Sequence, residues 1–316
     1  MHTHTIQKLS LFLPASIFFL GVFLIARTVF GAGSTQDLSS LVTIGNSAPT
    51  VSAVTINSGN DIVLTPNATT TVYVNFTVQD ANGCNDVFLN GTVTSTIFRT
   101  GVGSACSASD RNCYIVSTST NSCSGNASTS LATTTFYVYY FADSTTNTTT
   151  ASSSFPSDHW TGFAWAKDAS LASSSATSTA TVEMSVLTAL NVTTSSINYG
   201  TLSAGQDTGA TNQFATTTNA GNSTTTLRLH AVATLTAGAN SITTSSQAFS
   251  TSSFTYAGTS TALTASAVTV SGFLLTIPTT TTNVSRATYW GLTVPFGQAT
   301  GSYSGTTRFT ALYQEN

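Results

Sequence analysis

The chain carries very little charge. Of its 316 residues, 6% are Asp, Glu, Lys or Arg, whereas average globular proteins contain about 25%. Lys167 is the only lysine after Lys8, and the basic residues beyond position 34 are scattered. Nucleic-acid binding needs clustered positive charge, so we expect no nucleic-acid partner.

Helix formers and proline are also scarce. Lys, Glu and Met together number six, as does Pro, which argues against long helices and against a proline-rich mucin-like stalk. What is abundant is Ser and Thr, with 109 residues, beside a 41% hydrophobic and 10% aromatic content. Disordered tails are poor in aromatic and β-branched residues. The composition therefore predicts a Thr-rich β-protein held outside the cell.

The N-terminus predicts export. Lys8 precedes an almost wholly apolar run over residues 9–26, and the small residues Gly31 and Ala32 follow. This is the layout of a cleaved signal peptide, although the run is also just long enough for a retained membrane anchor. Either reading assigns residues 1–32 to a signal or anchor helix and places the rest at the cell surface or outside. Membrane contact is expected only through this segment.

The four cysteines lie within one short stretch: Cys84, Cys106, Cys113 and Cys123. An even count in an exported chain predicts two disulfides, with three connectivities open. A structural zinc site is the alternative, but the gaps do not match the usual short Cys pairs.

Period-two runs of apolar residues predict many strands. They occur at residues 72–78, 136–141, 182–186, 227–231, 268–277, 292–294 and 307–311. Short strands at this spacing favour β-sandwiches, and the exported length suits two. We expect an N-terminal arm at 33–47, a disulfide-bonded domain at 48–188 and a second domain at 189–316. No Pro or Gly lies between Ser170 and Tyr199, which predicts a stiff junction.

Two stretches resemble known surface modules. An Ig-like module of exported bacterial surface proteins resembles the stretch NSAPTVSAVTI…VYVNFTVQDANGCNDV, followed by DHWTGFAWAKD. In such modules a late strand carries an inward Trp and small residues. Here these are Trp160, Gly162, Ala164 and Ala166, ending at Asp168. A second type of bacterial surface β-sandwich resembles the stretches INYGTLSAGQ…TTNAGNSTTTLRL and YWGLTVPFGQATGSYSGTTRFTA. The resemblance implies an all-β chain of two tandem Ig-like sandwiches serving display, adhesion or assembly.

No reaction signature accompanies these features. Asp158 and His159 form the only acid–His neighbour pair in the exported part, and no G-x-S-x-G elbow occurs. Glycoside hydrolysis needs two placed carboxylates, and Glu183 and Glu315 are the only glutamates. We expect a protein that is not an enzyme, with a secreted hydrolase as the distant alternative.

A polar cluster offers one candidate metal site. Asp80, Asn82, Asn85 and Asp86 fall within seven residues, and carboxylate and amide oxygens are calcium ligands. The alternative is an Asx-rich turn in which Gly83 supplies a positive φ. We expect the turn, and no cofactor other than this candidate calcium.

Outward aromatic residues give a candidate partner face. If Trp160 points inward, period two turns Phe163 and Trp165 outward, and Tyr73 also faces outward. An exposed aromatic patch binds glycan or protein, so a carbohydrate-binding module is the rival reading. The alternative is that these rings pack under a loop or a neighbouring domain.

Sheet edges suggest self-association. Natural edges are guarded by charge, above all Lys, and by Pro, and this chain has few of either. Residues 38–44 (LSSLVTI) precede the first domain and could serve as a donated strand. The expected partners are therefore a cell-surface protein, a glycan or a second copy of the chain. Bulges, glycans or covering loops are the alternative protection.

Overall fold

The structure is a computed structural model that describes residues 37–146, 153–256 and 260–314. Within these residues the chain is nearly all-β, as predicted, and its sheets are antiparallel. The sheets belong to one compact unit, Gly45–Asn316. The predicted signal or anchor lies outside the described residues, and no helix among those described is long and apolar enough to cross a membrane.

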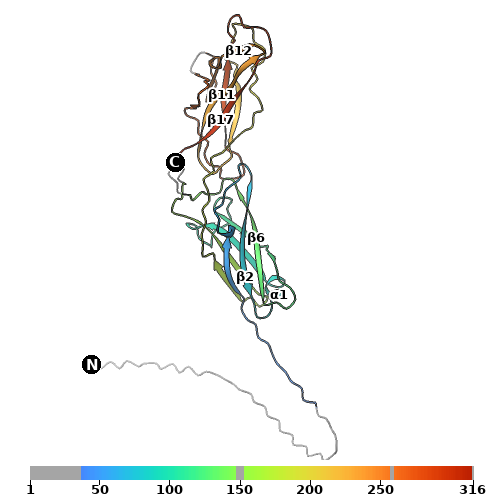
Figure 1. Ribbon diagram of the computed structural model, residues 1–316. Helices are drawn as coiled ribbons and strands as arrows, with labels where there is room; N and C mark the ends of the chain where they lie inside the picture. The colour runs from blue at the N-terminus through green and yellow to red at the C-terminus, as the bar shows by residue number, and fades with distance from the viewer. Residues whose placement is uncertain (1–36, 147–152, 257–259, 315–316) are drawn as a thin grey trace, which may run out of the picture. The chain divides into compact units, whose positions relative to one another are not determined.

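Two four-stranded sheets form the first sheet pair, which covers the N-terminal half of the compact unit. The first sheet has the order β1 (Thr50–Ile56), β2 (Thr69–Gln79), β6 (Thr129–Tyr139), β5 (Thr120–Asn121). The second has the order β4 (Cys113–Val116), β3 (Thr92–Arg99), β7 (Trp160–Lys167), β8 (Ser173–Thr177). β2 and β6 lie side by side in Figure 1 and pair along their whole length.

One apolar core joins these two sheets because their inward residues alternate as expected. The inward side chains of β2 are all buried: Val72, Val74, Phe76 and Val78. Trp160 is fully buried on β7, and its indole N–H donates to the carbonyl oxygen of Asp143 at 2.9 Å. Gly162 follows on the same face, where an added Cβ would press on Val74 and Ile56.

The second sheet pair is built in the same way. One sheet has the order β14 (Thr261–Ala262), β13 (Gln247–Ser250), β16 (Ser285–Leu292), β10 (Gln213–Asn219), β9 (Leu190–Val192). The other has the order β12 (Asn240–Ile242), β11 (Thr225–Ala237), β15 (Val268–Thr269), with β17 (Ser304–Tyr313) paired to β11. Trp290 is the largest buried side chain of this core, and it packs against Phe249 with ring centroids 5.5 Å apart.

Three local expectations were wrong. A five-residue helix, α1 (Cys84–Phe88), and two short 3₁₀ helices, η1 (Asn57–Gly59) and η2 (Thr244–Ser246), occur where no helix was expected. α1 is too short to show a helical period, and it begins after Gly83, whose φ is 107°. Residues 182–186 and 273–277 make isolated bridges instead of strands.

Hydrogen bonds connect the two sheet pairs where the chain passes from one to the other. The buried side chain of Asn222 accepts from the main-chain N–H of Leu187 at 2.6 Å. It donates to the carbonyl oxygens of Ala142 and Ser185 at 3.0 and 3.1 Å. The division predicted at 188/189 stays a prediction, because Gly45–Asn316 forms one compact unit.

The four cysteines form two disulfides, Cys84–Cys123 and Cys106–Cys113. The first closes a sequence separation of 39 residues and ties α1 to the segment before β6. The second closes only 7 residues and ends at the first residue of β4. The sequence left this connectivity open.

The two disulfides are expected to differ in their contribution to stability. Loop-closure entropy predicts that removing Cys84–Cys123 with paired Ser substitutions lowers the free energy of unfolding by about 4 kcal/mol, against about 2 kcal/mol for Cys106–Cys113. Denaturant unfolding of both double variants measures this difference. Equal losses would show that local packing, rather than chain entropy, sets the contribution.

Candidate functional site

In the described residues, β17 has a long open edge that lies beside a groove. β17 pairs with β11 on one side only. The main-chain N–H of Gln314 donates to Thr224 on the β11 side, so strand alternation directs the N–H and C=O groups of Thr307, Phe309 and Ala311 away from β11. These groups have no strand partner among the described residues.

The inward face of β17 is also incompletely covered. Thr307, Phe309 and Ala311 are only half-buried, whereas their partners Leu227, Leu229 and Ala231 on β11 are buried. Residues 193–206, which follow β9, contain no strand. Between this segment and β17 lies a groove of about 1410 Å³, whose apolar lining includes Ile197, Tyr199, Leu202 and Phe309.

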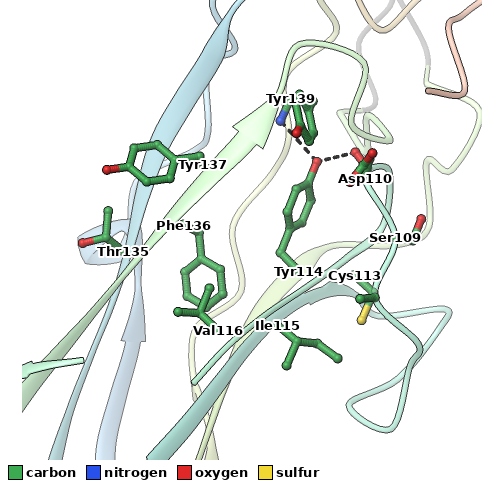
Figure 2. Close-up of a pocket in the computed structure, with 11 residues that line it drawn as sticks. Ser109, Asp110, Cys113, Tyr114, Ile115, Val116, Thr135, Phe136, Tyr137 and Tyr139 are labelled. Atoms are coloured by element: carbon green, nitrogen blue, oxygen red, sulfur yellow. Dashed lines mark hydrogen bonds between the residues drawn. The ribbon is translucent and has the colours of Figure 1, made fainter. Parts of the chain in front are cut away.

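A second, smaller groove lies beside β6 in the first sheet pair. β5 pairs only with Thr133 and Ala132, so in the described part of the chain no strand lies beside the end of β6 on that side. A groove of about 600 Å³ separates this edge from β4, and Ile115, Phe136 and Tyr137 line it (Figure 2).

Tyr114 partly closes this smaller groove. Figure 2 shows its hydroxyl between two main-chain groups: it accepts from the N–H of Tyr139 at 3.2 Å and donates to the carbonyl oxygen of Asp110. Burial raises the pKa of the Tyr114 phenol above its ordinary value, so the hydroxyl stays protonated. Only Thr135 and Tyr137 remain on the open edge of β6, fewer than on β17.

The predicted aromatic face is divided between two sheets. Tyr73 lies on β2 and is 46% exposed. Phe163 and Trp165 lie on β7 of the other sheet and are half-buried, with the Lys167 ammonium 5.7 Å from the Trp165 ring centroid. Trp160 is the inward residue, as the period of two predicted. Tyr73 therefore does not share one binding surface with the two β7 aromatics.

The structure brings two of the four candidate calcium ligands together and adds a third carboxylate. Ligand oxygens of Asp80, Asp86 and Asp168 lie within 4.8 Å of one another. Asn82 and Asn85 have other partners, since Asn82 accepts from the N–H of Ser47 at 2.6 Å and Asn85 donates to the carbonyl oxygen of Gly125 at 3.2 Å. Sequence reasoning did not include Asp168, which comes from the far end of β7.

The electrostatics of this acidic cluster are unfavourable. Burial raises the pKa of Asp80 above its usual value; the hydrogen bond from the Asn82 N–H lowers it, and the charges of Asp86 and Asp168 raise it again. The salt bridges found in the described parts of the chain involve other carboxylates. No basic side chain therefore balances the three charges there.

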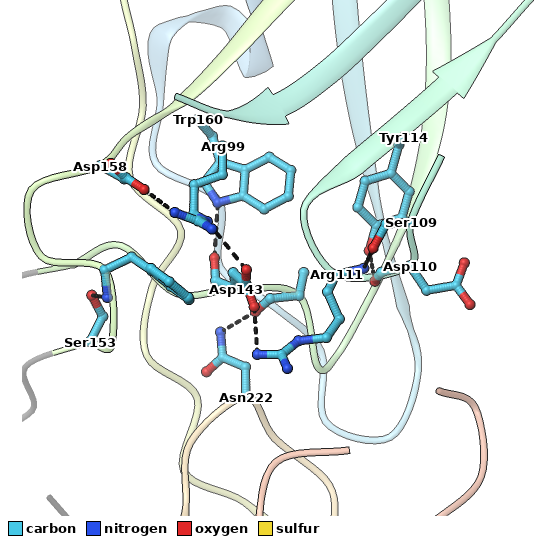
Figure 3. Close-up of polar contacts among 12 residues, drawn as sticks. Arg99, Ser109, Asp110, Arg111, Tyr114, Asp143, Ser153, Asp158, Trp160 and Asn222 are labelled. Carbon is cyan, nitrogen blue, oxygen red and sulfur yellow. Dashed lines mark hydrogen bonds and ion pairs between the residues drawn. The ribbon is translucent and has the colours of Figure 1, made fainter. Parts of the chain in front are cut away.

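Outside this cluster, the buried carboxylate of Asp143 is paired with arginine. Figure 3 shows Asp143 between Arg99 and Arg111, with N···O distances of 3.2 and 2.6 Å. Arg99 also pairs with Asp158 and lies over the Phe155 ring, 3.6 Å from its centroid. This network adjoins Ala142, whose carbonyl accepts from Asn222, so it supports the junction between the sheet pairs.

The Asp158–His159 neighbour pair is split by these contacts. Asp158 faces Arg99, whereas His159 Nδ1 lies 2.5 Å from Glu183 Oε1. Both side chains therefore have structural partners instead of one another.

Comparisons with known proteins give little further information. No protein-family model matches the chain, and no curated protein matches it. Among solved structures, the chain is similar to the secreted serine protease VesC from Vibrio cholerae, with 10% identity and a TM-score of 0.18 over 80% of this chain and 49% of that one. The chain thus spans about half the length of that protein, and likeness this low does not bear on fold or activity.

Loss of the Asp143 carboxylate is expected to destabilise the protein strongly. Asp143→Ala leaves Arg99 and Arg111 without their buried counter-charge, and such changes cost about 3–5 kcal/mol. Asp110→Ala is the matched control, because that side chain is exposed and its carbonyl, which binds Tyr114, is kept; surface changes of this kind stay within about 0.5 kcal/mol. Denaturant unfolding of both variants tests this, and equal losses would contradict the assigned role of the network.

Proposed function

We propose that this chain is a non-enzymatic exported surface protein of two tandem Ig-like β-sandwich domains, which assembles by β-strand addition. Two disulfides support export, because they persist in oxidising compartments. The sequence pattern of a signal or anchor in residues 1–32 supports the same location. A resident of the cell surface with so few charged edges suits a structural role in display or assembly.

The observation that carries this proposal is the open edge of β17 beside an apolar groove. Thr307, Phe309 and Ala311 direct main-chain donors and acceptors outward, and the side chains of Thr307 and Phe309 line a groove of about 1410 Å³. An added strand would satisfy those main-chain groups and cover the half-buried face of β17. Both gains come from one extended segment of about seven residues.

The proposed occupant is residues 38–44 of a second copy. Its apolar side chains are almost fully exposed, with Leu41 at 96% and Ile44 at 81%. Leu38, Val42 and Ile44 fall on one face of an extended strand, as period two requires. The segment carries no charge and no Pro, so nothing in it opposes entry into an apolar groove.

Sedimentation should report this assembly. We expect residues 33–316 to form dimers or larger species at high micromolar concentration, whereas residues 45–316, which retain the whole compact unit, stay monomeric because the donated strand is gone. A strict monomer in both cases would end the assembly proposal and leave a simple displayed module.

Proline substitution separates the two open edges. Thr307→Pro removes an N–H that points away from β11, so it blocks strand addition without breaking the β11 ladder. Thr135→Pro is the matched control, since it makes the same change on the open edge of β6. We expect Thr307→Pro to abolish self-association measured by sedimentation and Thr135→Pro to preserve it. The reverse pattern would place the acceptor on β6.

A further inference from the structure

The three carboxylates of Asp80, Asp86 and Asp168 come from different parts of the first sheet pair. Asp80 directly follows β2, Asp86 lies in α1, and Asp168 directly follows β7. Their ligand oxygens lie within 4.8 Å of one another, and Asp80 and Asp168 are each 1% exposed. Three carboxylates this close, two of them buried, repel one another strongly unless a cation or protons offset the charge.

A second observation points to a ligand. Asp80 Oδ1 accepts from the N–H of Asn82 at 2.7 Å, but Asp80 Oδ2 is buried and has no hydrogen-bond partner among the residues that the structure describes. Buried polar atoms are almost always satisfied, and a buried carboxylate oxygen left unpaired costs more than a neutral group. This oxygen therefore has the property expected of a metal ligand.

We propose that Asp80, Asp86 and Asp168 form a divalent-cation site that binds calcium. Calcium takes six to eight oxygen ligands in a flexible geometry, and the remaining positions can be filled by water or carbonyl oxygens. Asp86 is partly exposed, which leaves the ion a path from solvent. Magnesium demands a near-ideal octahedron at shorter distances, which suits this set of three separately held carboxylates less well.

The site would also fix the first residues of the compact unit. Asn46 Nδ2 donates to Asp168 Oδ2 at 2.9 Å, and the N–H of Ala172 donates to Asp168 Oδ1 at 2.9 Å. Each of these oxygens keeps a further lone pair that can ligate an ion while Asp168 holds this segment. Asn82, next to the cluster, accepts from the N–H of Ser47 and donates to the carbonyl oxygen of Gly45. Bound calcium would thus stabilise residues 45–47 on the sheet pair. This inference does not depend on strand addition.

Calcium titration of the full chain tests the site. After chelator treatment, calorimetry should detect calcium binding with a Kd of about 1 mM or tighter, the range of extracellular modules. Saturating calcium should raise the Tm by about 3 °C or more. Asp80→Asn should abolish both effects, and Asp207→Asn, which changes an exposed Asp of the second sheet pair, should keep them.

Several results would overturn the assignment. The first is the absence of binding at 10 mM calcium, which is about ten times the expected Kd. The second is an equal rise in Tm in NaCl of matched ionic strength. The third is a rise in Tm with magnesium but not with calcium. Asp80→Asn should fold without calcium at least as stably as the unsubstituted chain, because it removes a buried negative charge. If circular dichroism shows that this variant is unfolded, the partly exposed Asp86→Asn replaces it, and retained calcium binding in that variant overturns the proposal.

Discussion

Main-chain hydrogen bonds between strands hold this fold together. A chain with 6% charged residues has few ion pairs to hold it together and few charges to guard its strands. Every strand in the described residues is paired, and β5, β14 and β15 add two residues each. At the open edge of β17, main-chain donors and acceptors without a strand partner in the described residues lie beside an apolar groove. The proposed assembly follows from that coincidence.

The first sheet pair holds buried acidic side chains at two sites, and the two sites differ in how the charge is balanced. Asp143 is balanced by Arg99 and Arg111, so its charge is compensated within the chain. Asp80 lies with two further carboxylates, and one of its buried oxygens is unpaired. Because burial of unbalanced charge is costly, the second arrangement supports the proposed cation site, whereas the first is balanced within the chain. This contrast within one sheet pair is the physical basis for assigning calcium to one site and a structural role to the other.

Sequence patterning predicted the features that depend on neighbours in the chain. The period of two placed Trp160 and the inward residues of β2 in the core, and the scarcity of helix formers predicted the all-β class. Sequence patterning could not predict which residues, distant in the sequence, the fold brings into contact. Asp168 joins Asp80 and Asp86 because the ends of β2 and β7 meet near α1, and Arg99 reaches Asp143 from another strand end. The open edge of β17 could not be predicted either, because alternation of apolar and polar residues does not depend on whether one or two strands lie beside a strand.

Residue-resolved amide exchange tests strand addition most directly. In residues 33–316 at high concentration, strand addition should protect the outward amides of Thr307, Phe309 and Ala311, together with alternate amides of residues 38–44. The outward amides of Thr135 and Tyr137 on β6 should continue to exchange rapidly, and dilution should reverse the protection. Fast exchange along β17 in a chain that is fully associated would contradict the account.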